Sequence, residues 1–119
     1  RRFVAYVLRY GDKVLVRRRP AAVVNANLWE FPNIELVRGK QSTPAIPDSL
    51  KLHPFGVIKH TITNNRITLR ALTTSVNGEA RSLANAFSAE WRPIADLDAL
   101  PFTSAHAKLR HLLMTATEL

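Results

Sequence analysis

Apolar runs of β-forming residues predict two antiparallel hairpins. Phe3–Leu8 and Val14–Val16 are rich in β-branched and aromatic residues, and Gly11-Asp12 between them is typical of a tight turn. A similar pattern recurs around Thr63-Asn64-Asn65, three residues whose types favour turns. The strands of this second hairpin, which has a polar tip, are predicted over residues 57–62 and 66–72.

Shorter elements are predicted in the rest of the chain. The strand of the first hairpin should end near Pro20. The stretch from Arg38 to Pro54 is polar and interrupted by prolines, so any helix around Ile46–Leu52 should be short. The other predictions are an extended piece over Ile34–Val37, a turn at Asn77-Gly78, a strand over Ala86–Trp91, and a short helix over Ile94–Leu100 that Pro101 ends.

The last segment predicts a helix that packs on the sheet. Ser104 is a suitable cap, and an apolar face at helical spacing follows it. That face comprises Ala105, Leu109, Leu112, Leu113 and Ala116. His106, Lys108 and His111 fall mostly on the opposite side, where we expect solvent or a partner. Together the elements predict a single α+β domain over residues 1–119, built in layers.

The positive net charge of the chain predicts that it binds a polyanion. Seventeen Lys and Arg against nine Asp and Glu give a formal net charge of +8, which is a strong positive field for one small domain. The alternative is an ordinary solvated basic surface. The longest apolar run, Phe3–Leu8, is far shorter than the ~20 residues of a membrane span. We therefore expect a soluble domain with no membrane partner, and the absence of cysteine permits a reducing cytoplasm.

The sequence offers no cluster of residues for metal or acid–base chemistry. A Mg²⁺-dependent hydrolase needs several carboxylates close together, yet Asp48 is the one acidic residue between Leu36 and Gly56. The four histidines lack the spacing of a zinc site. The absence of cysteine excludes disulfides and iron–sulfur ligation in this stretch. We therefore predict no catalytic residue, no metal and no cofactor in this domain.

Two segments of the chain resemble the opening of Nudix domains: Val14–Pro20 (VLVRRRP) and Asn27–Pro32 (NLWEFP). Working Nudix hydrolases continue with a glycine-led box that holds an Arg-Glu pair and further glutamates on a helix. Residues 39–50 read GKQSTPAIPDSL instead. The resemblance implies a Nudix-like α/β/α sandwich with a mixed β-sheet and a C-terminal helix, and the missing box implies that Nudix chemistry is lost.

The later part of the chain is similar to the C-terminal domain of A/G-specific adenine DNA glycosylases of the MutY family. Residues 58–69 (IKHTITNNRITL) resemble the hairpin of that domain. Residues 91–94 (WRPI), residues 100–102 (LPF) and the terminal helix through Lys108 resemble its closing pattern. In this family the domain grips 8-oxoguanine opposite adenine, while a separate N-terminal catalytic domain with a 4Fe-4S cluster flips and excises the adenine.

The resemblance therefore implies two partners and a place in base excision repair. The first partner is double-stranded DNA that contains 8-oxoguanine:adenine, and the second is the N-terminal catalytic domain of the same chain. A start at Arg1-Arg2-Phe3, without an initiator Met, fits a piece of a longer glycosylase. We expect that parent protein to work in a bacterial cytoplasm, at the nucleoid.

The tip of the second hairpin is the predicted reading site. 8-Oxoguanine presents an N7–H donor beside a C8 carbonyl acceptor, and a hydroxyl group supplies the matching acceptor and donor. The family commonly has Phe-Ser-His where this chain has Ile62, Thr63 and Asn64. The resemblance assigns base reading to Thr63, a hydrogen bond to the base or its phosphate to Asn64, and a wedging or packing role to Ile62. Turn formation alone is the alternative.

Residues beside the tip are expected to support it. His60 matches a recurrent histidine of the family and is predicted to brace the loop. Phosphate contacts are predicted for basic residues on the two strands, with an ordinary solvated strand face as the alternative. These basic residues are Lys59, Arg66 and Arg70, and Asn65 completes the predicted site.

Two further predictions concern the first half of the chain. Arg17, Arg18 and Arg19 cannot all lie on one surface, because neighbours along a strand point to opposite faces. Trp29 and Phe31 are expected in the core rather than against nucleic-acid bases. Two other functions stay open: a nucleotide hydrolase with a relocated metal site, and a Nudix-like binding domain without any preference for damaged DNA.

Overall fold

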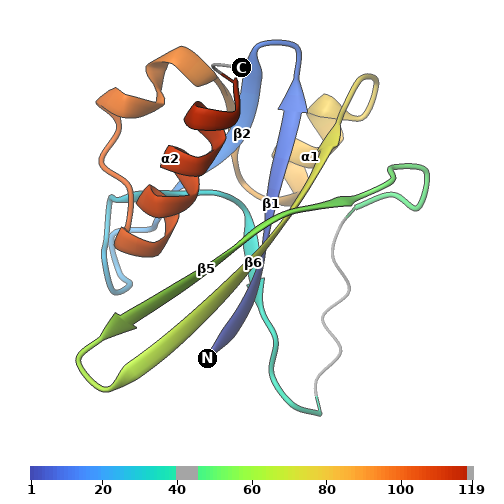
Figure 1. Cartoon of the computed structure of the whole chain (residues 1–119). Coiled ribbons are helices and arrows are strands. Elements are labelled where there is room, and N and C mark those ends of the chain that lie inside the picture. Colours follow the sequence, from blue (N-terminus) through green and yellow to red (C-terminus); the bar gives the residue numbers. More distant parts are fainter. Residues whose placement is uncertain (40–45, 118–119) are drawn as a thin grey trace.

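A computed structural model describes residues 1–39 and 46–117 and contains a seven-stranded mixed sheet (Figure 1). The main order of the strands is β3-β2-β1-β6-β5, while β4 pairs with β1 and β7 pairs with β2. The strands are β1 (Arg2–Tyr10), β2 (Lys13–Arg18), β3 (Trp29–Glu30), β4 (Asn33–Glu35), β5 (His53–Ile62), β6 (Asn65–Ser75) and β7 (Glu90–Pro93).

The central strands β1 and β6 run parallel, and the other strand pairs are antiparallel. Ala5 and Val7 of β1 are buried on one face of the sheet, and Tyr6 and Leu8 are buried on the other. Burial on both faces explains why the sequence of β1 is a continuous apolar run without alternation. The predicted first hairpin is confirmed, because Tyr10 pairs with Lys13 across the turn.

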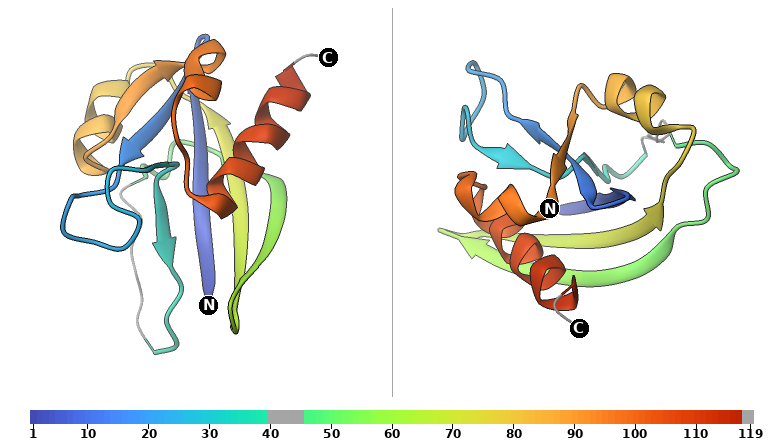
Figure 2. Two further views of the ribbon diagram at one scale, coloured as in Figure 1. Left: turned by 90° about the vertical axis from the view of Figure 1, so that its left-hand side faces the viewer. Right: turned by 90° about the horizontal axis from the view of Figure 1, so that it is seen from above.

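Helices cover both faces of the sheet (Figure 2). The C-terminal helix α2 (Ser104–Thr117) packs on one face, where Leu109 and Leu113 join Leu69 in one core. The short helix α1 (Ala80–Ala86) lies on the opposite face, where Leu83 belongs to a second core. A 3₁₀ helix, η1 (Ile94–Ala99), connects β7 to α2. The predicted α+β layering, with a mixed sheet and a C-terminal helix, is therefore confirmed.

The predicted strand before β7 differs from the structure. The strand expected over Ala86–Trp91 is wrong in its first half, because Ala80–Ala86 forms α1 and β7 begins at Glu90. Ala and Leu are good helix formers, and Ala80 and Leu83 lie on the buried side of α1. Around Ile46–Leu52, where any helix is expected to be short, the described residues contain a turn. None of the helices in the described ranges has the length and apolar character of a membrane span.

The start and the inner face of α2 also need correction. Ser104 is the first helical residue, and Thr103 holds the cap position because its carbonyl accepts a hydrogen bond from Ala107 N–H at 2.7 Å. Leu109 and Leu113 are buried as predicted, whereas Leu112 and Ala116 of the predicted apolar face are exposed. Leu112 nevertheless lies next to Gly56 of β5, and Ala105 packs against the core, so most of the predicted apolar face does meet the sheet.

His106 is buried, although the helical pattern predicts it on the outer side of α2. Its Nδ1 accepts a hydrogen bond from the backbone N–H of Phe31 at 3.1 Å, and its ring stacks on the Phe31 ring with a centroid distance of 6.1 Å. Burial lowers the pKa of His106 from 6.5 to about 4. Since Nδ1 is an acceptor and the ring is neutral at pH 7, the proton lies on Nε2.

We predict that His106 makes folding stability depend on pH. The unfolded chain protonates this histidine near pH 6.5, whereas the folded protein resists protonation down to about pH 4. Stability is therefore fully present above pH 6.5 and falls as the pH drops towards 4, by about 3 kcal/mol in total. In His106→Asn, an amide oxygen replaces Nδ1 as the acceptor, and this part of the pH dependence should disappear between pH 7 and 5.

Urea unfolding at several pH values tests this prediction. His111→Asn is the matched control, because His111 lies on the exposed side of the same helix. The control should keep the pH dependence of the parent protein. A His106→Asn variant with an unchanged pH dependence would show that the buried imidazole is not the group that titrates.

Candidate functional site

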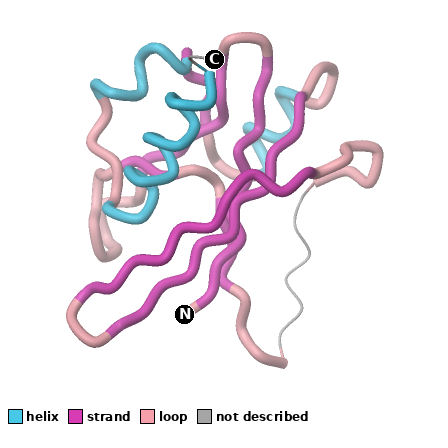
Figure 3. The backbone as a smooth tube through the Cα atoms, in the orientation of Figure 1, coloured by secondary structure: helices cyan, strands magenta, loops and turns pink. Residues whose placement is uncertain are grey.

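The predicted second hairpin is confirmed and forms the longest antiparallel pair of the sheet. Strands β5 and β6 project beyond the rest of the molecule and end in a tight turn (Figure 3). The pairing runs to Ile62 and Asn65. The turn therefore contains two residues, Thr63 and Asn64, rather than the three that the sequence suggests. Both residues are exposed at the tip.

Thr63 has a backbone conformation that is unfavourable for its residue type. Its φ is +56°, in the left-handed region, where a β-branched side chain is a true outlier. The other two-residue hairpin turn of the chain, Gly11-Asp12, has the same pattern, with a φ of +60° at its first position. Turns of this kind strongly prefer glycine there. Forming the turn therefore does not explain why position 63 is a threonine.

The strand register divides the predicted site residues between the two faces of the hairpin. Ile58 and Leu69 pair directly and face α2. Because side chains alternate along a strand, His60, Ile62 and Asn65 share the face towards α2. Lys59, Thr61, Arg66 and Arg70 lie on the opposite face. The hairpin thus has a mainly apolar inner face, a basic outer face and a polar tip.

The bracing role of His60 stays a prediction, because its position in the structure does not test that role. The side chain is half-buried on the inner face, opposite Ile67. Its Nδ1 is buried and has no hydrogen-bond partner in the part of the chain that the structure describes. A role in bracing the loop would therefore have to come from packing or from the other ring nitrogen.

A cleft of about 210 Å³ opens beside the inner face of the hairpin. It lies between the hairpin, the loop that follows β2 and the start of α2. The hairpin contributes Ile62, Ile67 and Leu69 to this cleft. The other lining residues are Arg1, Phe3, Arg19, Val24, Asn25, Glu30, Asn33, Thr103, Ser104, Ala105 and His106. Sequence reasoning missed this cleft, because its walls come from separate segments at the start, the middle and the end of the chain.

Glu30 is the buried charge at one wall of the cleft. Its carboxylate accepts hydrogen bonds from Arg17 Nε at 2.9 Å, from Arg19 Nη1 at 2.7 Å and from Asn33 Nδ2 at 3.0 Å. Burial acts to raise the pKa of Glu30, but the hydrogen bonds and charges of the two arginines outweigh it, and the pKa is lowered. Glu30 is therefore ionised and serves as the common partner of two cations.

This ion pair explains the run of three arginines. Arg17 and Arg19 point to the side of Glu30, whereas Arg18 is exposed on the other side. The predicted alternation is confirmed, and Arg17 and Arg19 have a structural partner. Phe31 is fully buried as predicted. Trp29 is half-buried and packs against the first core, with the Arg92 guanidinium 5.3 Å from its ring centroid.

Arg19 also fixes the loop at the mouth of the cleft. Its Nε donates a hydrogen bond to the carbonyl of Val24 at 2.8 Å. Val24 is 78% exposed, and Ile62 on the facing hairpin is 45% exposed. Exposed apolar residues from the loop and the hairpin therefore lie on two sides of a cleft that has a polar wall. In residues 1–39 and 46–117, no group of three or more His, Asp or Glu side chains is placed to hold a metal ion.

We predict that neutralising Glu30 destabilises the fold strongly. Glu30→Gln leaves two partly buried guanidinium groups without a counter-charge, which should lower the free energy of unfolding by about 3 kcal/mol. Glu90→Gln is the control, because Glu90 pairs with Arg92 at 3.5 Å on the exposed surface, and the change should be below about 1 kcal/mol. Denaturant unfolding measures both values. Equal effects of the two substitutions would contradict the role given to Glu30.

Comparison with known proteins identifies the family of this fold. A family model described as a NUDIX domain matches residues 3–112. Among curated proteins, no sequence matches the chain. The C-terminal domain of mouse MUTYH, solved in a complex with human PCNA, superposes with a TM-score of 0.71 at 20% identity, covering 98% of this chain and 89% of that one.

Other similar structures have different functions. The NUDIX domain of Shewanella oneidensis NrtR, complexed with ADP ribose, has a TM-score of 0.72 at 15% identity and covers 98% of this chain and 87% of that one. A MutT Nudix hydrolase of methicillin-resistant Staphylococcus aureus 252 has a TM-score of 0.69 at 21% identity and covers 96% and 95% of the two chains. Identities this low establish a shared fold and do not select one function. Because the family model spans most of the sequence, the chain belongs to the Nudix domain family.

Proposed function

We propose that this chain is the DNA-recognition domain of a MutY-type adenine DNA glycosylase and that its β5–β6 hairpin reads 8-oxoguanine. The observation that carries the proposal is Thr63, an exposed hydroxyl at the tip of the hairpin in a backbone conformation that disfavours threonine. Strained residues persist where the side chain has a use that outweighs the strain. The strain therefore favours reading over mere turn formation.

The chemistry of the tip fits the oxidised base. The Hoogsteen edge of 8-oxoguanine places an N–H donor next to a carbonyl oxygen, and guanine has an acceptor in place of that donor. The Thr63 hydroxyl can accept from the N–H and donate to the carbonyl, while the exposed amides of Asn64 and Asn65 add a donor and an acceptor each. Ile62, beside the tip, is exposed enough to pack against a base.

The missing hydrolase residues also support this proposal. The segment at residues 39–50 contains Asp48 as its one acidic residue, where Nudix hydrolases carry their glutamates. The similarity to the C-terminal domain of MUTYH agrees with a place in a glycosylase. The proposal includes a partner catalytic domain with a 4Fe-4S cluster elsewhere in the parent chain, and action in the cytoplasm on DNA with 8-oxoguanine:adenine.

A nucleotide hydrolase is the main alternative, because the MutT-type neighbour has a similar fold and this chain has a cleft. Hydrolysis would require a relocated metal site. Release of product from an oxidised nucleoside triphosphate in the presence of Mg²⁺ would support the alternative and oppose our proposal.

We predict that three substitutions at position 63 separate reading from turn formation. Thr63→Ser keeps the hydroxyl and should keep the preference for 8-oxoguanine over guanine. Thr63→Val keeps the β-branched shape, and Thr63→Gly removes the strain. Both should reduce the preference by about tenfold, as expected for the loss of one good contact to a base. Fluorescence anisotropy with duplexes containing 8-oxoguanine:adenine or guanine:adenine measures the ratio of affinities.

Stability provides the control for these variants. Glycine adopts a positive φ without steric cost, so Thr63→Gly should leave the free energy of unfolding unchanged or raise it. A variant that is more stable and yet loses its preference cannot be explained by damage to the turn. If Thr63→Val and Thr63→Gly keep the full preference, the hydroxyl does not read the base and the proposal is wrong.

A further inference from the structure

The outer face of the hairpin carries a cluster of cations that point away from α2. Lys59, Arg66 and Arg70 lie on this face by the register of β5 and β6, and all three are exposed. Arg2 of β1 pairs with Thr68 and joins them on the same face. We refer to these four residues as the outer basic face.

Charge is segregated between the two faces of the sheet. The described residues of β1, β4, β5 and β6 contain a single carboxylate, Glu35. Glu35 pairs with Phe3 and therefore lies on the side of α2, where its Oε2 contacts Arg1 Nε at 2.9 Å. The outer basic face thus has no acidic residue from its own strands. An ordinary solvated strand face would be expected to mix both signs.

The pairing places the cations in a staggered array. Lys59 pairs with Thr68, and Arg66 pairs with Thr61, so no cation stands directly opposite another on β5 and β6. Arg66 and Arg70 are four residues apart on β6, a distance of about 14 Å along the strand. A compact anion can contact one or two of these groups, whereas an extended polyanion can contact all of them.

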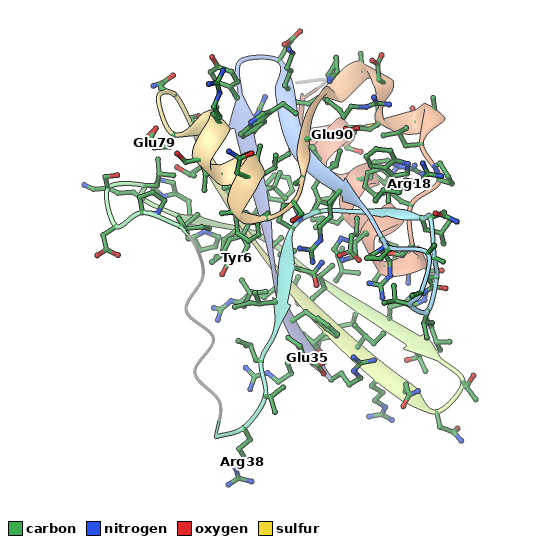
Figure 4. All side chains as sticks on the ribbon, turned by 180° about the vertical axis from the view of Figure 1, so that it is seen from behind. Tyr6, Arg18, Glu35, Arg38, Glu79 and Glu90 are labelled. Atoms are coloured by element: carbon green, nitrogen blue, oxygen red, sulfur yellow. The ribbon has the colours of Figure 1, made fainter. Side chains whose placement is uncertain are left out.

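The outer basic face is open to a partner. The opposite end of the same side of the sheet is covered, because Leu72 and Tyr6 pack into the core under α1. Figure 4 views this side, with Tyr6 near α1 and the hairpin extending away from both. Val57, which pairs with Arg70 on this face, is 55% exposed. The surface therefore combines uncompensated positive charge with some apolar area.

We propose that the outer basic face binds the sugar–phosphate backbone of a nucleic-acid duplex and thereby sets the position of the hairpin tip. This inference rests on the proposed function for its role, since contacts to phosphates fix the register without reading the sequence. The expectation that this face binds a polyanion depends only on its exposed charges and does not need the proposed function. The tip and the outer face then form one continuous interface, which borders the cleft of the inner face at Ile62.

The salt dependence of binding tests the proposal. The triple variant Lys59→Gln, Arg66→Gln, Arg70→Gln removes three of the four cations. For an undamaged duplex, the slope of log K against log salt should fall by about 0.9 for each lost contact, or about 2.7 in all. The control Lys13→Gln, Arg81→Gln, Lys108→Gln removes the same charge from exposed positions on β2, α1 and α2, and its slope should change by less than one.

Further variants and a second ligand test the role proposed for the outer basic face. Arg66→Lys with Arg70→Lys keeps the charge and should keep the slope, and thermal unfolding checks that every variant is folded. Equal losses in the two triple variants would indicate a diffuse positive field and overturn the proposal. Binding to vesicles of anionic lipid that is tighter than binding to the duplex would also overturn it. The test uses undamaged DNA, so it stays valid if Thr63 proves not to read the lesion.

Discussion

The register of the β5–β6 hairpin is the constraint on which the candidate interface depends. Ile58 and Leu69 pair with each other and pack towards Leu109 and Leu113 of α2, so a slip by one residue would turn these side chains out of the core. The same slip would bring the cations of the outer face inwards. Packing against α2 therefore determines which residues form the inner face, the outer face and the two-residue turn.

The turn itself connects structure to function. The chain uses glycine at the first position of the Gly11-Asp12 turn and threonine at the equivalent position of the Thr63-Asn64 turn, with nearly equal φ values of +60° and +56°. The first turn has glycine, the residue type that a positive φ favours, and the second turn does not. The two turns can be compared within one molecule. The comparison indicates a use for the Thr63 hydroxyl on structural grounds, independently of the family resemblance.

Local patterns in the sequence predict the hairpins, a short helix over Ile94–Leu100 where η1 forms, and α2, because each of these elements is a continuous segment of the chain. They fail for His106 and for the cleft. The hydrogen bond between Phe31 N–H and His106 Nδ1 joins residues 75 positions apart, and helical periodicity alone places this histidine on the wrong side. Helix α1 is missed because seven residues are too few for a clear period. The strain at Thr63 is a backbone property that no residue pattern shows.

The central claim is that the hairpin tip distinguishes oxidised from normal guanine, and a nitrogen-15 NMR titration tests it most directly. The domain is titrated with a short duplex containing 8-oxoguanine:adenine and with the same duplex containing guanine:adenine. We expect the amide signals of residues 61–66 to shift more with the oxidised duplex, while those of β2 and α1 respond alike to both. Equal and diffuse shifts with the two duplexes would contradict lesion reading by this hairpin.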